Sequence, residues 1–232
     1  NYVWEWKPEH PDRLTCNYCG HVVEADTYPK NGVINRKTPQ GEVVPHPVYR
    51  DEEGNTYPIW QTIGFKKADH AYGWIEALGI AYALTGKDAY ARAATQLLTR
   101  LAEVYPGYIL HDNFRFDKYP WGWAGKLSGW HLTDARIFMR LGTAWDVIRH
   151  SDTISPEERA FIEENLFRKG GEMFTAVRPL QGISNDVAYR FGVVALIGRL
   201  LEAEDILDWV LESDESYGIV LENLFFKDGA RH

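Results

Sequence analysis

The sequence predicts a mainly α-helical protein, built from antiparallel helical hairpins behind an irregular N-terminal arm. Of its 232 residues, 45% are apolar and 25% are charged, which is a globular composition. From Lys66 onward, apolar residues recur at spacings of three and four, the pattern of amphipathic helices. The breaks between these helices are short, and short turns join antiparallel neighbours. No strand-like alternation follows residue 62.

Residues 1–62 and 63–232 are predicted to form two regions. The first is rich in Pro, Gly, Asn and Asp, with turn-like runs at 29–32 and 51–55. We therefore expect an irregular arm packed on the helical body, with short strands at 41–44 and 56–59.

The helices of the second region have recognisable starts and stops. The turn from Thr85 to Asp88 separates the first two helices, predicted at 66–84 and 88–104. Ser155, followed by Pro156 and then by Glu158, has the pattern of a capping box. The other predicted helices cover 132–148, 155–177, 185–201, 205–211 and 217–226.

Charge and hydropathy exclude two classes of partner. The net charge of −8 argues against a general nucleic-acid binder, which neutralises phosphates with Lys and Arg. No run approaches the ~20 apolar residues of a membrane span.

The first residues lack the basic start and apolar run of a signal peptide. The sequence does not indicate an oligomeric state.

A long loop near the middle of the chain gathers aromatic and basic residues. Aromatic rings present flat faces on which sugar rings stack, and polar side chains fix hydroxyl and acid groups. We interpret the loop and the helix start after it as a saccharide groove, with a packed structural plug as the alternative. Its candidate substrate-binding residues are Arg115, Lys118, Tyr119, Trp121, Trp123, Trp130 and His131.

Asn185 is expected in the first turn of a helix, where free N–H groups and the helix dipole favour an anion. The alternative role is an N-cap, for which Ser184 is equally placed. Tyr189 and Arg190 follow on the same helix and are further candidate binding residues.

Cys16 and Cys19 form one C-x-x-C pair and are the only cysteines of the chain. The sequence Cys16-x-x-Cys19-Gly20 is typical of a zinc knuckle, and His10, His21 and His46 are possible further ligands. A structural zinc ion is one interpretation, and buried free thiols or a local disulfide are the others.

The chain resembles the N-terminal part of heparinase II/III-like polysaccharide lyases over nearly its whole length. The matching residues are the segments 8–12, Cys16 to Gly20, 83–91, 98–103, 105–106, 144–146 and 184–185. The resemblance implies an incomplete (α/α) toroid, with a C-terminal β-sheet domain beyond His232. It also implies a periplasmic or extracellular location and catalysis that requires no cofactor.

Such lyases cleave uronate-containing chains, of the alginate or glycosaminoglycan type, by β-elimination. A neutralised carboxylate makes the C5 proton acidic enough for a base to remove, and an acid protonates the leaving oxygen at C4. The resemblance implies that Asn185 neutralises the carboxylate, with Arg190 as a weaker candidate. The family's catalytic Tyr would fall beyond His232, and Asp186 stands where some members have His.

Two other functions are compatible with the residues. A toroidal glycoside hydrolase needs two carboxylates across a cleft, and Asp112, Asp117 and Asp134 are available. A non-catalytic glycan-binding module would need the aromatic and basic residues alone.

Overall fold

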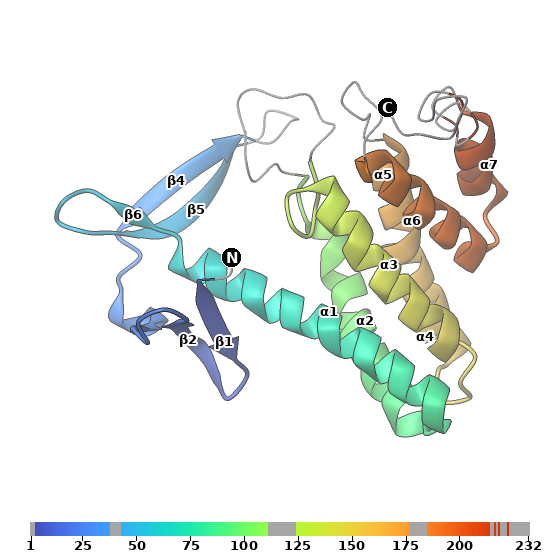
Figure 1. The fold of residues 1–232 in the computed structure, drawn as a ribbon, viewed down its shortest axis with the longest axis horizontal. Helices are drawn as coiled ribbons and strands as arrows, with labels where there is room; N and C mark the ends of the chain where they lie inside the picture. The colour runs from blue at the N-terminus through green and yellow to red at the C-terminus, as the bar shows by residue number, and fades with distance from the viewer. Residues whose placement is uncertain are drawn as a thin grey trace. The chain divides into compact units, whose positions relative to one another are not determined.

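The computed structural model describes residues 3–37, 43–110, 124–176 and 185–213, together with 216, 218 and 222. Over these residues the chain is mostly helical, with two small antiparallel sheets. It divides into two compact units, Asn1–Gly73 and Trp74–His232. Figure 1 shows the sheets in the first unit and a stack of helices in the second.

The first unit begins with a three-stranded antiparallel sheet where the sequence predicted an irregular arm. Its strands, in sheet order, are β1 (Trp4–Lys7), β2 (His10–Cys16) and β3 (Val22–Glu24). Leu14 of β2 pairs with Val23 of β3, and both are buried in a small core that includes Ile59 and Ile63. The irregular arm was therefore a wrong prediction, because each short strand buries too few side chains to leave an alternating pattern.

A second antiparallel sheet completes the strands of this unit. It contains β4 (Gly32–Lys37), β5 (Val43–Arg50) and β6 (Thr56–Tyr57), in that order. The strand predicted at 56–59 is confirmed for its first two residues. The strand predicted at 41–44 is confirmed from Val43, and residues 41 and 42 lie outside the described residues.

The helices follow the predicted hairpins closely. They are α1 (Ile59–Thr85), α2 (Asp88–Val104), α3 (His131–Ile148), α4 (Pro156–Ile162), α5 (Lys169–Ala176), α6 (Asn185–Leu201) and α7 (Glu204–Glu212). A π-helical segment, η4 (Glu163–Arg168), joins α4 to α5. The capping box is confirmed, since the Ser155 hydroxyl accepts from the Glu158 N–H at 3.1 Å and the Glu158 carboxylate accepts from the Ser155 N–H at 3.2 Å. The helix predicted at 217–226 lies almost wholly outside the described residues.

In the second unit, α3 runs parallel to the part of α1 from Trp74 onward on one side and to α6 on the other. Glu76 of α1 pairs with Arg140 of α3, and further along both helices Gly79 lies against Ala144. Arg136 of α3 lies over Tyr189 of α6, and further along both Gly142 lies against Leu196. In each pair of helices, residues further along one helix contact residues further along the other, which requires that the helices run parallel. We call α1, α3 and α6 the first layer.

The connecting helices α2, α4 with α5, and α7 form a second layer that runs in the opposite direction. The contacts between α5 and α6 show that these two helices are antiparallel. Phe174 lies near Arg190, and the earlier residue Gly171 lies near the later residue Ile197. Between the layers, the buried ring of Phe138 meets Tyr105 and Phe174 edge to face, at centroid distances of 5.4 and 5.5 Å. A toroid would continue this layered pattern into a ring; the described helices do not establish the ring, and the toroid stays a prediction.

Within the described part of the chain, no helix is both long and apolar enough to cross a membrane.

Candidate functional site

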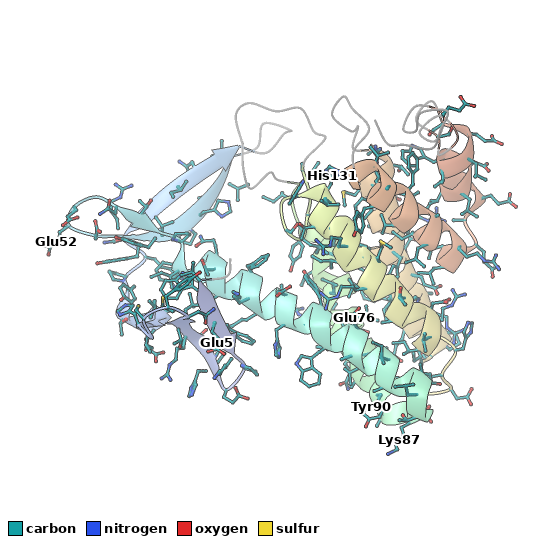
Figure 2. All side chains as sticks on the ribbon, in the orientation of Figure 1. Glu5, Glu52, Glu76, Lys87, Tyr90 and His131 are labelled. Carbon is teal, nitrogen blue, oxygen red and sulfur yellow. The ribbon has the colours of Figure 1, made fainter. Side chains whose placement is uncertain are left out.

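Several predicted site residues lie at one end of the helical unit. Because α3 and α6 are parallel neighbours, the first turns of both helices lie at the same end, which we call the site end. Trp130 precedes α3 and His131 begins it, while Asn185 begins α6 and Tyr189 follows one turn later. Figure 2 labels His131 at the start of α3. The fold thus brings together residues that are far apart in the sequence.

The other predicted residues lie outside the described part of the structure. Arg115, Lys118, Tyr119, Trp121 and Trp123 lie in 111–123, outside the described residues. The described structure gives the backbone of Asn185 but not its side chain. Their binding and catalytic roles stay predictions.

The most constrained feature of the site end is the Asp134 knot, formed by Asp134 and the loop 124–130 wrapped around it. The buried Asp134 carboxylate accepts hydrogen bonds from the backbone N–H groups of Lys126, Leu127 and Ser128, at 2.6, 2.9 and 2.8 Å. It also contacts the Ser128 hydroxyl at 2.6 Å. Gly125 lies so close that a β-carbon there would be 2.8 Å from the carboxylate. One side chain of α3 therefore fixes the loop that leads from 111–123 into the helix.

Burial shifts the pKa values of two groups at this end. Complete burial of Asp134 raises its pKa, and the hydrogen bonds from Ser128, Leu127 and Lys126 oppose that rise. Burial also lowers the pKa of Lys126, whose ammonium group is half-buried and lies 5.0 Å from the centre of the Tyr105 ring. The knot therefore holds a buried acid and a cation close together in sequence at the entrance to α3.

His131 and Trp130 differ in how much of each side chain is exposed. His131 is only 3% exposed, and Trp130 is half-buried. In this arrangement His131 lies in the packed base of the site end. Direct contact between these two side chains and a sugar stays a prediction.

Arg190 binds the protein itself. Its side chain is 3% exposed, its Nε donates to the Phe174 carbonyl at 2.7 Å, and its guanidinium lies 4.5 Å from the centre of the Trp209 ring. These contacts hold α6 against the carboxyl end of α5 and against α7. In this structure the residue supports the start of α6, and its predicted contact with a uronate finds no support in these contacts.

Sequence reasoning missed the pairing of Arg136 with Tyr189. Both side chains are exposed, and the guanidinium carbon lies 5.9 Å from the centre of the Tyr189 ring. The two residues come from different helices, so only the parallel packing of α3 and α6 brings them together. The one signal in the sequence was the placement of each about one turn after a predicted helix start.

Cys16 ends β2, and Cys19 lies in the turn between β2 and β3. The Cys16 N–H donates to the His21 carbonyl at 2.8 Å, and the Gly20 N–H donates to the Cys16 carbonyl at 3.0 Å. Hydrogen bonds from the backbone of Cys19 and Tyr18 lower the pKa of the Cys16 thiol. Both cysteines are free thiols, with Cys19 exposed rather than buried.

Over the described residues, no three His, Cys, Asp or Glu side chains gather where they could hold a metal ion. His10, His21 and His46 therefore do not complete a zinc site with the two thiols in this arrangement. A structural zinc ion at Cys16 and Cys19 stays a prediction.

Comparison with known proteins indicates one relationship. An alginate lyase from Stenotrophomonas maltophilia (strain K279a) is 26% identical over 168 residues, an alignment that covers 68% of this chain and 21% of that protein. The chain thus spans about a fifth of the length of the relative that it matches. No protein-family model matches the chain. The similarity supports a relationship to polysaccharide lyases and does not confirm the heparinase II/III family.

Proposed function

We propose that this chain is the helical part of a polysaccharide lyase that cleaves a uronate-containing acidic polysaccharide, of the alginate or glycosaminoglycan type, by β-elimination. The observation that carries the proposal is the similarity to the alginate lyase. The layered helical hairpins and the shared site end of α3 and α6 are compatible with it.

In this proposal Asn185 donates a hydrogen bond to the uronate carboxylate at the start of α6. Neutralising the carboxylate stabilises the negative charge that develops when the C5 proton leaves. Arg115 and Lys118 attract the acidic chain, and the aromatic residues Tyr119, Trp121 and Trp123 stack on its sugars. The proposal assigns no residue of the chain to the removal of the C5 proton or to the protonation of the leaving oxygen.

The glycoside hydrolase alternative loses one of its candidate carboxylates. Asp134 is 0% exposed and is surrounded by hydrogen-bond donors of its own loop. A general acid or base must reach the substrate directly or through one water molecule. Asp112 and Asp117 lie outside the described residues, and no observation favours the hydrolase.

The test is product analysis with the natural full-length protein, on polymannuronate and on glycosaminoglycans. A lyase releases oligosaccharides with an unsaturated, ultraviolet-absorbing terminal sugar, and a hydrolase releases saturated ones. Unsaturated products on an acidic polysaccharide support the proposal. Saturated products would establish hydrolysis instead. Retention of alginates and glycosaminoglycans without cleavage would establish a glycan-binding module.

The role of Asn185 is tested by Asn185→Ala. Removing one donor to a developing anion costs roughly 100-fold to 1,000-fold in turnover, while polysaccharide affinity should change little. Asn165→Ala is the matched control, because Asn165 lies in η4 and its side-chain amide donates to the Phe161 carbonyl of α4. Equal turnover in the two variants would exclude Asn185 as the neutralising residue.

A further inference from the structure

We propose that Arg136 and Tyr189 form a binding subsite for the carboxylate of a uronic sugar. The inference rests on the proposed function and adds to it a residue, Arg136, and a place on the surface. The subsite lies on the exposed side of the first layer, where α3 and α6 run side by side.

The geometry presents a charged group on a fixed support. The Arg136 guanidinium lies over the Tyr189 ring, with 5.9 Å between the guanidinium carbon and the ring centre. An arginine over an aromatic face is held by cation–π attraction, while the N–H groups at its edge can still donate. Tyr189 is 37% exposed, so part of its ring is also accessible to a ligand.

The buried Arg190 holds the turn of α6 that carries Tyr189. It is the next residue on α6 after Tyr189, and its hydrogen bond to the Phe174 carbonyl fixes that turn of the helix against α5. The Asp134 knot fixes α3 in the same way, less than one turn before Arg136. Arg136 and Tyr189 therefore both lie on helical turns that buried contacts hold in place.

Arg136 differs from its neighbours in the charge that it faces. Arg140, the next arginine along α3, is paired with Glu76 at 2.7 Å, and Arg149 is paired with Glu163 at 3.5 Å. Among the ion pairs of the described residues, none involves Arg136. No carboxylate of the described residues therefore balances the charge of this exposed arginine, and such a group is suited to an acidic ligand.

The chemistry of the pair fits a uronic sugar better than a neutral one. A guanidinium fork makes two parallel hydrogen bonds to a carboxylate, and an aromatic ring packs against the apolar side of a sugar. At 1.5 Å per residue, Tyr189 lies about 6 Å along α6 from Asn185. The subsite is therefore near the predicted reaction centre, where it holds substrate charge without taking part in the chemistry.

The experiment compares three variants of the natural full-length protein by native affinity electrophoresis in the cold. The gels contain polymannuronate or the same polymer after its carboxyl groups have been reduced to alcohols. Arg136→Gln removes the fork and the charge, and Arg136→Lys keeps the charge alone. Arg199→Gln is the control, because Arg199 is an exposed arginine in the last turn of α6 and its loss changes the net charge equally.

Arg136→Gln should weaken retention by polymannuronate about tenfold, as expected for a charged hydrogen bond worth 1.4 kcal/mol or more. Arg136→Lys should lose less, and Arg199→Gln should stay within about twofold of the wild type. None of the variants should differ on the reduced polymer. Thermal melting by circular dichroism checks that every variant is folded.

Three results would overturn the subsite. The first is equal losses for Arg136→Gln and Arg199→Gln, which would indicate general electrostatics. The second is a loss for Arg136→Gln that persists on the reduced polymer. The third is a wild type that polymannuronate does not retain.

The subsite and the lyase reaction fail separately. Unsaturated products from both the wild type and an Arg136→Gln variant of unchanged KM would refute the subsite and keep the lyase. Retention that depends on Arg136, without unsaturated products, would refute the lyase and keep the subsite.

Discussion

The two ends of the helical unit are stabilised by different kinds of interaction. At the site end, the charged side chains of Asp134 and Arg190 are buried and are held mainly by backbone groups. At the opposite end, where α2 and α4 begin, Ser155 caps α4 and Arg92 pairs with Glu158 at 2.6 Å. The side chains of that ion pair are 39% and 30% exposed.

This difference matters because burial changes what an interaction costs. Moving a charge out of water is expensive, and its hydrogen bonds repay that cost only when the geometry is good. Exposed ion pairs cost little and contribute little. The site end is therefore the part of the helical unit where small changes should have large effects, as positioning of functional groups requires.

The largest effect is expected for Asp134→Ala. The substitution leaves three backbone N–H groups of the knot without their acceptor, of which that of Ser128 is buried and those of Lys126 and Leu127 are half-buried. An unsatisfied buried group costs about 1–3 kcal/mol. We expect a loss of about 3 kcal/mol or more in the free energy of unfolding, measured by urea denaturation. A loss below about 1 kcal/mol would show that the loop does not depend on Asp134.

Asp134 should also give the wild type a distinct pH dependence. Its folded pKa is raised by burial above the unfolded value of about 3.9, so the folded state holds the proton more tightly. The contribution to stability is complete below the unfolded pKa and is lost as pH rises through the folded pKa. The difference in unfolding free energy between wild type and Asp134→Asn should therefore vary with pH in this direction, because the amide does not titrate. A constant difference would contradict the raised pKa.

The next effect is expected for Gly125→Ala. The added methyl would lie 2.8 Å from the Asp134 carboxylate, and overpacking of this kind costs about 1–3 kcal/mol. Gly107→Ala is the matched control, since a β-carbon at Gly107 meets nothing within 4 Å. Equal thermal midpoints for the two variants would mean that the Asp134 knot accommodates the added methyl group without loss of stability.

At the opposite end, Ser155→Ala should have a moderate effect. The alanine loses the hydroxyl that accepts from the Glu158 N–H, and removal of an N-cap costs about 1 kcal/mol. Ser155→Thr keeps the hydroxyl and should retain most of the stability. A loss in the free energy of unfolding for Ser155→Ala as large as that for Asp134→Ala would contradict the difference between the two ends.

The smallest effect is expected for the pair of Arg92 and Glu158. A double-mutant cycle with Arg92→Ala and Glu158→Ala should give a coupling of roughly 0.5 kcal/mol, weaker at high salt. Arg92 lowers the pKa of Glu158, so this stability is present above the unfolded pKa and is lost as pH falls through the folded pKa. Its pH dependence thus has the opposite sign to that of Asp134, and a coupling that rises on acidification would contradict the pairing.

The sequence predicted those elements whose signals are local. Ser155, Pro156 and Glu158 form a capping box within four consecutive positions, and the structure confirms it. The helix from Asp88 to Val104 follows from its apolar spacing and from the stop before it. The strands of the first unit were missed because their core comes from single residues, such as Leu14 and Val23, that lie on different strands.

The candidate site was less predictable than the fold. The sequence selected Arg190 as a possible ligand-binding cation, but its burial depends on Phe174 and Trp209, which lie on two other helices. It offered Asp134 as a possible catalytic carboxylate, although the loop before α3 surrounds that side chain. It did not predict the contact between Arg136 and Tyr189, because no local sequence pattern around either residue indicates its partner on another helix.

By itself, the sequence determined the helical hairpins, their order and most of their boundaries. These follow from apolar spacing, caps and turns, which act over a few residues. Only the tertiary structure decided which charged side chains are buried supports and which face solvent. Burial and charge pairing depend on residues that approach from other helices. For this reason the arginine at position 190 is a buried anchor, whereas the arginine at position 136 is an exposed cation.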